Sequence, residues 1–365
     1  MVKQTIMTLT KFKEFLNCGA LLQHGPDAFN LVIGPFEQIQ QDLASYHSSE
    51  PLIYQPHFWD FLETKKANSF LKGKQSFILS RAELLACLQG FDSVFNLNWQ
   101  PATEPEFKAQ FEWSQIQFAQ QQLQKTVPII SQLSEFDFDV IHLAYLLRNL
   151  VSEIKFGWTY GYWNHGEGFL GHSPELICNW QKAEAKLQTT ALAGTMPNQP
   201  GARKELLADK KNLHEHQIVI ADIVNKLKSM PYFLQRPTEI LELKHLLHLK
   251  TEFTVSAIDC KEAVEVIEKL HPTAALGLFP SSDEEYHKLK DLQRSLNRKN
   301  FAAPFSFICE HSVLAVAAIR SLYFRKHSLQ IFSGCGVTKQ SIYENELTEL
   351  ALKRDSVKKM MGLLN

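Results

Sequence analysis

The irregular order of strand-like and helix-like segments is the feature that most constrains the fold. Apolar residues at helical spacing predict helices at 104–124, 138–150, 203–230, 261–270 and 283–296, and a last helix from Ile342. Alternating apolar residues bounded by turn residues predict strands at 155–163, 168–180, 186–193, 240–258, 305–309, 314–323 and 329–337. Because these segments do not follow a βαβ rhythm, a Rossmann fold and a (β/α)8 barrel are excluded. The order predicts an α+β layered sandwich.

The composition is that of a globular protein with a sizeable core and a nearly neutral surface. Of the 365 residues, 45% are hydrophobic, and the formal net charge is -1. This balance does not favour nucleic acid or an anionic membrane surface as a partner. The six cysteines are scattered without a C-x-x-C pair, which is typical of reduced thiols. No apolar run approaches a membrane span, and the first residues lack a signal-peptide core, so we expect a cytoplasmic enzyme.

The last helix carries acidic and basic residues on one face. A capping box at Ser341–Glu344 predicts where the helix begins. Glu346, Glu349 and Lys353 then follow at i, i+3 and i+7, which places them on the same face. Such a row can hold a divalent cation beside an anionic ligand. A solvated ladder of salt bridges is the alternative interpretation.

Two further segments are candidates for a site. Gly334-Cys-Gly336 is predicted to form a turn from a strand into this helix, where backbone N–H groups can face an anion. A simple tight turn explains the same glycines. The helix predicted at 203–230 carries Glu215 between His214 and His216. The two histidines fall on different faces, so we expect no shared zinc site, and a surface position for Glu215 stays open.

Three charged residues lie beside predicted apolar strands. Lys125 opens a strand, and burial there favours the neutral amine, which is the form that acts as a base. Glu175 lies where a loop enters a strand. Arg320 ends an apolar run, a position from which its guanidinium can face a pocket. Each of the three, taken alone, is also compatible with a structural role.

Several short motifs, in one order along the chain, resemble those of the chorismate-utilising enzymes. The matching segments run from about Lys125 to Lys353, and they are Gly171-His-Ser-Pro-Glu-Leu176, Ala191-Leu-Ala-Gly-Thr195, Leu207–His216, His248-Leu-Lys250, Leu270-His-Pro-Thr-Ala-Ala275, Ala318-Ile-Arg-Ser321, Gly334-Cys-Gly336 and Glu346–Lys353. Within that family the chain looks most similar to the menaquinone-pathway isochorismate synthases. Any single motif is weak, but the full set in the family's order is a strong signal.

The resemblance implies a magnesium site. Glu215 and Glu349 match the carboxylates that hold Mg²⁺, and the ion in turn binds the ring carboxylate of chorismate. Glu346 matches a second acidic residue that acts on the metal through water. Arg320 and Lys353 match cations that hold the carboxylates of the substrate.

The resemblance also implies an acid and a base. Glu175 matches the general acid that protonates the leaving C4 hydroxyl, and Lys125 matches the general base that activates water for attack at C2. His248 and Thr195 match positions that line the substrate ring, and Gly336 matches a backbone contact to the bound anion. General acid–base help of this kind is worth about 10²–10⁴-fold per group.

Single positions separate the branches of this family. Ala193 stands where some aminodeoxychorismate synthases resemble each other in having a nucleophilic lysine. Ala275 stands where the salicylate and anthranilate synthases typically carry a threonine linked to pyruvate elimination. The chain departs from the family pattern at Leu278, Ala303 and Ser306, which replace glycines. Since glycine allows close approach of the backbone to a ligand, these changes are expected to bear on substrate affinity.

We therefore expect one large α+β unit over 1–365, with two stacked, mainly antiparallel sheets flanked by helices. Residues 1–105 form a divergent N-terminal part, and residues 106–365 form the catalytic part that carries the motifs. The expected activity is Mg²⁺-dependent conversion of chorismate to isochorismate by a monomer, in menaquinone or siderophore biosynthesis. The alternatives are a salicylate, anthranilate or aminodeoxychorismate synthase, and a chorismate-binding protein with impaired turnover.

Overall fold

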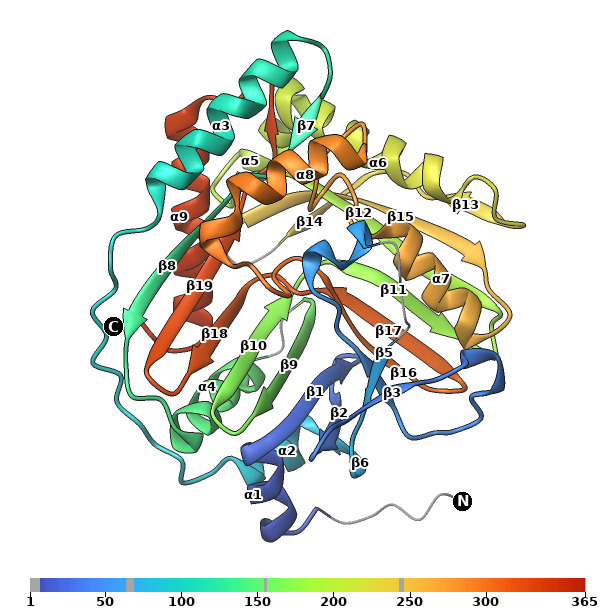
Figure 1. Ribbon diagram of the computed structural model, residues 1–365, viewed down its shortest axis with the longest axis vertical. Coiled ribbons are helices and arrows are strands. Elements are labelled where there is room, and N and C mark those ends of the chain that lie inside the picture. Colours follow the sequence, from blue (N-terminus) through green and yellow to red (C-terminus); the bar gives the residue numbers. More distant parts are fainter. Residues whose placement is uncertain (1–6, 64–68, 154–155, 243–245, 365) are drawn as a thin grey trace.

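Two large antiparallel sheets form the framework of the molecule (Figure 1). The computed structural model describes residues 7–63, 69–153, 156–242 and 246–364. Within these ranges every strand pairing is antiparallel. The predicted class, α+β with stacked antiparallel sheets flanked by helices, is confirmed.

The first sheet has eight strands among the described residues, in the spatial order β6-β2-β1-β9-β10-β18-β19-β8. In that order the strands cover Gln75–Ser80, Ala28–Ile33, Cys18–His24, Trp158–Asn164, Glu167–Ser173, Ser321–Arg325, Ser328–Gly334 and Ile129–Glu135. Strands from the N-terminal part therefore pair directly with strands from the motif-bearing part.

The second sheet has ten strands in the same described ranges, in the order β13-β15-β12-β11-β17-β16-β4-β5-β3, and β14 also pairs with β15. In that order, with β14 last, the strands cover Phe233–Gln235, Leu246–Ser256, Lys186–Pro197, Leu176–Gln181, Ser312–Ala317, Pro304–Ile308, Leu52–Tyr54, Ser69–Lys72, Glu37–Gln40 and Glu239–Glu242. A small separate sheet joins β7 (Lys125–Thr126) to β20 (Val337–Thr338).

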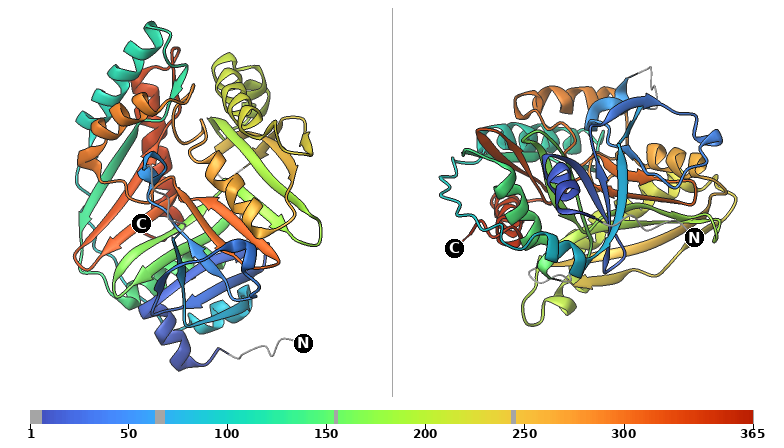
Figure 2. Two further views of the ribbon diagram at one scale, coloured as in Figure 1. Left: turned by 45° about the vertical axis from the view of Figure 1, so that its right-hand side comes forward. Right: turned by 90° about the horizontal axis from the view of Figure 1, so that it is seen from below.

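Helices lie outside the two sheets (Figure 2). In chain order, the α-helices of the described residues are α1 (Leu9–Asn17), α2 (Arg81–Cys87), α3 (Glu104–Ala119), α4 (Val140–Ser152), α5 (Ala202–Ala208), α6 (Lys210–Leu227), α7 (Cys260–Leu270), α8 (Asp283–Leu292) and α9 (Tyr343–Met360). Short 3-10 helices are η1 (Leu43–Ser45), η2 (Phe58–Leu62) and η3 (Arg294–Leu296).

The inner faces of the two sheets pack against each other. Leu22, Tyr160 and Phe169 come from the eight-stranded sheet, and Phe305 and Val316 come from the ten-stranded sheet. All five are buried in one cluster. Because successive side chains of a strand point to opposite faces, alternate residues of these strands enter the inner layer and the others face the helices.

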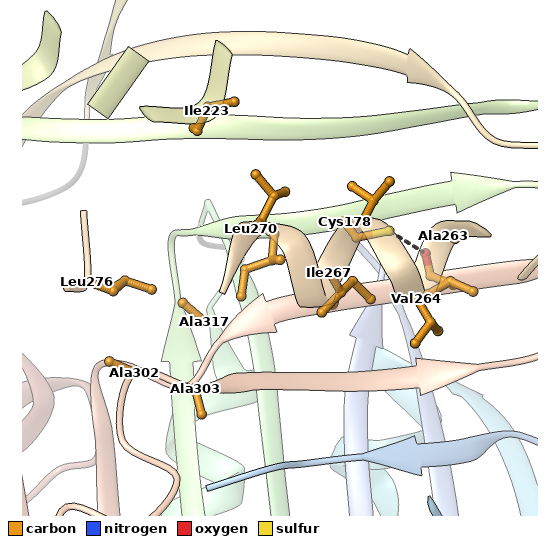
Figure 3. Packing of buried hydrophobic residues seen from close by; sticks show 14 of the residues in the cluster. Cys178, Ile223, Ala263, Val264, Ile267, Leu270, Leu276, Ala302, Ala303 and Ala317 are labelled. Atoms are coloured by element: carbon orange, nitrogen blue, oxygen red, sulfur yellow. Dashed lines mark hydrogen bonds between the residues drawn. The ribbon is translucent and has the colours of Figure 1, made fainter. Parts of the chain in front are cut away.

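Helix α7 shows how the outer layer is fixed. Val264, Ile267 and Leu270 are spaced at three residues, so they form one apolar stripe against the ten-stranded sheet, beside Cys178 of β11 (Figure 3). The Asp259 side chain caps the helix by accepting a hydrogen bond of 2.8 Å from a backbone N–H of the first turn. Full burial of one such aliphatic side chain stabilises the fold by about 1.5–3 kcal/mol.

Two segments predicted as single strands are each divided between the two sheets. The predicted strand at 168–180 is β10 of the eight-stranded sheet followed by β11 of the ten-stranded sheet, with Glu175 at the crossing. The predicted strand at 314–323 is β17 followed by β18, with Arg320 at the crossing. Arg320 has a backbone φ of 55°, in the left-handed region, so the strand cannot continue through it.

One predicted helix is divided in two, and one predicted helix cap does not form. The helix predicted at 203–230 is two helices, because Asp209 ends α5 and its side chain accepts a hydrogen bond of 2.7 Å from the backbone N–H of Asn212 at the start of α6. The capping box predicted at Ser341–Glu344 does not form. The Ser341 hydroxyl instead accepts a hydrogen bond of 3.1 Å from the backbone N–H of Thr338, and Ile342 precedes the first turn without a side-chain cap.

Candidate active site

One cavity collects most of the residues that the sequence singled out. It encloses about 80 Å³ and lies where the chain crosses between the sheets, next to α6 and α9. Nine of the predicted site residues line it, and these are Glu175, Thr195, Glu215, His248, Ala275, Arg320, Gly336, Glu349 and Lys353. The other two are not part of the lining: Lys125 pairs with Glu215 at 3.4 Å, and Glu346 pairs with Lys211 at 2.8 Å.

Glu175 and Arg320 are held by a reciprocal pair of backbone hydrogen bonds. The carbonyl of Glu175 accepts from the N–H of Ala317 at 3.1 Å, and the carbonyl of Arg320 accepts from the N–H of His172 at 3.2 Å. The crossing at Glu175 is therefore bonded to β17, which leads to Arg320, and the crossing at Arg320 is bonded to β10, which leads to Glu175. This arrangement fixes an acidic and a basic side chain relative to one another.

Glu175 is buried and only 5% exposed. Burial raises the pKa of its carboxyl to about 7, although the charges of Lys125 and Lys353 act in the opposite direction. A carboxyl with a pKa near neutrality retains a proton that it can donate.

Lys125 is almost completely buried, with 1% of its surface exposed. Its Nζ donates a hydrogen bond of 2.6 Å to the carbonyl oxygen of Ala274 and lies 3.4 Å from Oε1 of Glu215. Lys125 is therefore held by two oxygen atoms, one from the backbone and one from a carboxylate that lines the cavity.

Three carboxylates come from two helices. Glu215 lies on α6 and is 7% exposed, which rules out the alternative of a surface position. Glu346 and Glu349 lie on one face of α9, as predicted, and Glu349 pairs with Lys353 at 2.7 Å. Burial raises the pKa of Glu349, but the charges of Lys353, Lys211 and Arg320 outweigh it and hold that pKa below its ordinary value.

Glu346 differs from Glu349 in its surroundings. It is 1% exposed, and burial together with the charge of Glu349 raises its pKa. Its Oε1 accepts from Lys211 at 2.8 Å, while its Oε2 has no hydrogen-bond partner in the described part of the chain. The salt-bridge ladder predicted as an alternative is therefore present as ion pairs, but these pairs are largely buried.

Arg320 is a buried cation, only 9% exposed. Burial lowers its pKa to about 10, so it stays charged at neutral pH. Its guanidinium forms no ion pair within the described residues, whereas Lys353 pairs with Glu349 and also donates to the carbonyl oxygen of Gly334 at 2.8 Å. An anionic ligand would provide the missing partner of Arg320.

His248 and Thr195 form a polar pair on the cavity wall. Nδ1 of His248 lies 2.9 Å from Oγ1 of Thr195, and its Nε2 has no partner among the described residues. Burial and the charges of Arg320 and Lys353 hold the pKa of His248 well below its ordinary value, so the ring is neutral. Gly194, with φ of 77°, interrupts the β12 pairing just before Thr195 and directs this residue toward the cavity.

Gly336 allows a close approach of the backbone to charged side chains. A Cβ at this position would overlap the Glu215 carboxylate and would lie 2.8 Å from Cε of Lys125. The predicted turn from a strand directly into a helix is wrong, because β20 and a short turn lie between Gly336 and α9. Of the two neighbouring histidines, His214 is exposed, whereas His216 is buried with its Nε2 2.8 Å from Oγ1 of Thr251.

Two cations near the cavity were missed in the sequence. Arg298 lines the cavity, donates to the carbonyl oxygen of Phe301 at 3.1 and 3.2 Å, and stacks on Phe58 with its Cζ 3.3 Å from the ring centre. Lys211 pairs with Glu346. The signal for Lys211 was present, because it precedes Glu215 by four residues and so shares its helix face.

The three replaced glycines lie outside the cavity lining. Leu278 packs in a buried cluster with side chains of α3, α8 and α9, and Ala303 lies in the core beside Ala302 and Ala317 (Figure 3). The Ser306 hydroxyl donates to the carbonyl oxygen of Tyr54 at 3.3 Å. The added side chains therefore fill the core of this protein rather than the cavity.

Comparison with known sequences decides the family. A family model described as "Chorismate binding enzyme" matches residues 82–363. The chain belongs to the chorismate-binding enzyme family. This family match spans every residue of the cavity described above.

The similar proteins include isochorismate synthases and an anthranilate synthase component. The isochorismate synthase MenF of Bacillus subtilis (strain 168) is 29% identical over 249 residues, which are 65% of this chain and 52% of that protein. The chain spans about half the length of the curated relatives it matches first. The structure of MenF, the menaquinone-specific isochorismate synthase from Escherichia coli, superposes with a TM-score of 0.76 at 18% identity and covers 99% of this chain and 92% of that chain.

The fold itself is common to both branches. Anthranilate synthase component I from Streptococcus pneumoniae TIGR4 superposes with a TM-score of 0.69 at 13% identity, covering 99% of this chain and 95% of that chain. At such identities the likeness shows the shared fold alone. No helix within the described residues of this chorismate-binding enzyme is long and apolar enough to cross a membrane.

Proposed function

We propose that this chorismate-binding enzyme converts chorismate to isochorismate, and the observation that carries the proposal is the pairing of a buried acid with a buried lysine in one cationic cavity. Glu175 has a pKa near 7, and Lys125 is close enough for its charge to act on that pKa. Arg320 supplies a buried positive charge without an ion-pair partner in the described ranges. Chorismate is a dianion that carries a ring hydroxyl to be expelled, and it suits this set of groups.

In the proposed reaction, water adds at C2 of the ring and the hydroxyl at C4 leaves. Lys125 accepts a proton from the attacking water. Both conjugated double bonds of the ring shift as the new C–O bond forms at C2 and the old one breaks at C4. Glu175 donates its proton to the departing hydroxyl, which leaves as water, so atoms and charge balance.

Two cations and the polar pair on the cavity wall orient the substrate in this proposal. Arg320 and Lys353 bind the substrate carboxylates, and the backbone at Gly336 approaches the same anion. His248 and Thr195 line the ring, with the neutral imidazole offering Nε2 to a ring substituent. Holding the ring in one orientation between acid and base removes much of the entropic barrier.

Mg²⁺ is the proposed cofactor, held by Glu215 and Glu349 with Glu346 acting through water. The donors fit a hard cation that takes oxygen ligands from one or two carboxylates, substrate and water. The buried and unbonded Oε2 of Glu346 and the missing side chain at Gly336 provide an acceptor and space. No group of three or more metal-binding side chains converges within the described residues, so substrate and water would complete the coordination. When bound, the ion would neutralise a carboxylate of the substrate and withdraw charge from the ring.

Ala275 favours isochorismate as the final product. It lines the cavity and carries no hydroxyl to assist removal of the C2 proton, the step that releases pyruvate in salicylate and anthranilate synthases. Ala193, also on the wall, provides no amine nucleophile. A chorismate-binding protein with impaired turnover is the second candidate, and the joint presence of Lys125 and Glu175 argues against it.

The proposal also covers the division of the chain, its location and its pathway, all taken from the family. Residues 106–365 carry every group of the proposed mechanism, and residues 1–105 complete the two sheets. We propose a cytoplasmic monomer that serves menaquinone or siderophore biosynthesis. All six cysteines are free in the structure, as reduced thiols would be.

Product analysis tests the proposal. The pure protein is incubated with chorismate and MgCl2, with and without ammonia, and the products are resolved by chromatography. Isochorismate alone supports the assignment. Salicylate, anthranilate or aminodeoxychorismate as the main product would refute it, and unchanged chorismate would favour a binding protein.

A further inference from the structure

Lys211 has no role in the reaction proposed above, yet it lies among all three acidic residues of the site. It is the second residue of α6, one turn before Glu215. Its Nζ is 2.8 Å from Oε1 of Glu346, across the gap between α6 and α9. Burial lowers the pKa of Lys211, but the charges of Glu215, Glu346 and Glu349 outweigh it and hold that pKa above its ordinary value. Lys211 is therefore paired with Glu346 and lies near enough to Glu215 and Glu349 for their charges to act on it.

The lysine differs from the other two lysines of the site in its access to solvent. The Lys211 side chain is 26% exposed, whereas the side chain of Lys125 is 1% exposed and that of Lys353 is 16% exposed. Its partner Glu346 is 1% exposed. A lysine has a flexible stem and a strongly hydrated head, so Lys211 can move its charge into water without unfolding the helix.

We propose that Lys211 is the internal counter-cation of the carboxylate cluster, and that it leaves Glu346 when a divalent cation binds between α6 and α9. The inference rests on the proposed function, since it assumes a metal at Glu215 and Glu349. A buried carboxylate without a counter-charge is strongly destabilising, so the metal-free cluster needs a cation of its own. A second cation in the same place repels the first, and the two therefore compete.

Competition and a supporting role for Lys211 predict opposite changes in the affinity for Mg²⁺ when the lysine is removed. If Lys211 occupies the cluster in nearly all metal-free molecules, the apparent affinity for Mg²⁺ is reduced by the small fraction of molecules in which it has left. Lys211→Met then tightens Mg²⁺ binding, by about tenfold for a cluster that is nine-tenths occupied. If Lys211 instead positions Glu346 for the metal, the same variant weakens Mg²⁺ binding.

Calorimetric titration with MgCl2 in the absence of chorismate measures this difference. The control is Lys288→Met, because Lys288 is partly exposed and its Nζ lies 2.9 Å from the buried Glu285 on α8, outside the cavity. We expect a lower dissociation constant for K211M and an unchanged one for K288M. Thermal unfolding in EDTA and in MgCl2 should show a lower transition temperature for metal-free K211M and a larger rise with Mg²⁺ than in the wild type.

A measurement on the wild-type protein covers the case in which K211M does not fold. Acetylation of individual lysines is followed by mass spectrometry with and without MgCl2. Faster modification of Lys211 with Mg²⁺, at an unchanged rate for Lys288, supports displacement, and an unchanged or slower rate at Lys211 overturns it. Equal or weaker Mg²⁺ binding by folded K211M overturns the counter-cation but leaves the metal site intact. Failure of every protein to bind Mg²⁺ overturns both, and turnover of chorismate, assayed separately, reports on the proposed reaction.

Discussion

Replacing Glu175 with glutamine should make the protein more stable at neutral pH and almost inactive. Glu175 is 5% exposed, and burial raises its pKa from 4.5 to about 7. The unfolded chain releases this proton near pH 4.5, while the folded protein keeps it until about pH 7. Between these values the folded state binds more protons than the unfolded state, so the contribution of Glu175 to stability falls as the pH rises.

The size of this loss follows from the same pKa values. Each pKa unit corresponds to about 1.4 kcal/mol, so the rise from 4.5 to about 7 costs the wild type about 3 kcal/mol once the pH exceeds about 8. Below pH 4.5 the carboxyl is protonated in both states and the cost disappears. Glutamine has a similar shape and cannot ionise, and therefore avoids the cost at every pH.

Urea unfolding of both proteins from pH 4.5 to pH 8.5 tests this reasoning. The free energy of unfolding of E175Q, minus that of the wild type, should rise by about 3 kcal/mol across the range and level off near pH 8. Glu184→Gln, at an exposed turn, is the control and should show no comparable rise. A difference that does not change with pH would show that Glu175 is not held protonated by burial. Since E175Q cannot donate a proton, its kcat should fall by about 10²–10⁴-fold.

Other predictions address the remaining groups of the site. In the wild type, kcat should decline as the pH rises past about 7, because Glu175 loses its proton, and a rate that keeps rising to pH 9 would contradict this assignment. Lys125→Met should lower kcat by about 10²–10⁴-fold and, by leaving Glu215 unpaired, lower the transition temperature; near-normal turnover would exclude Lys125 as the base. EDTA should abolish activity and MgCl2 restore it, and Glu349→Gln should raise the Mg²⁺ requirement without unfolding the chain, as circular dichroism would show. Ala275→Thr should release some pyruvate, detected by a coupled lactate dehydrogenase assay, at a packing cost of about 1–3 kcal/mol.

Local periodicity explains which parts of the site were predictable. The helical repeat alone places Glu346, Glu349 and Lys353 on one face of α9, and the structure has them so. The helix start was less predictable, because the Ser341 hydroxyl is used by the turn that follows β20 rather than by α9. Which backbone N–H a capping hydroxyl accepts from depends on which donor lies nearest, and the tertiary structure determines which donor that is.

The sheet crossings could not be read from the sequence. A strand that stays in one sheet and a strand that passes into the other show the same alternation of apolar residues, so 168–180 and 314–323 each looked continuous. The positive φ of Arg320 is unusual for a residue with a long side chain, and an arginine at this position does not predict it. For the same reason, no pattern in the residues places Glu175 and Arg320 together without the family resemblance.

The two crossings explain how a shared fold can support different chemistry. Glu175 and Arg320 are fixed by backbone hydrogen bonds between the crossings, which depend on strand register and not on side-chain identity. Ala193 and Ala275 are wall positions whose side chains end at Cβ, and substituting them leaves these backbone bonds in place. We therefore expect that exchanging single wall residues can change the product of the proposed reaction without disturbing the backbone that holds Glu175 and Arg320. The anthranilate synthase component superposes with a TM-score of 0.69 at 13% identity, which shows that the framework itself is shared.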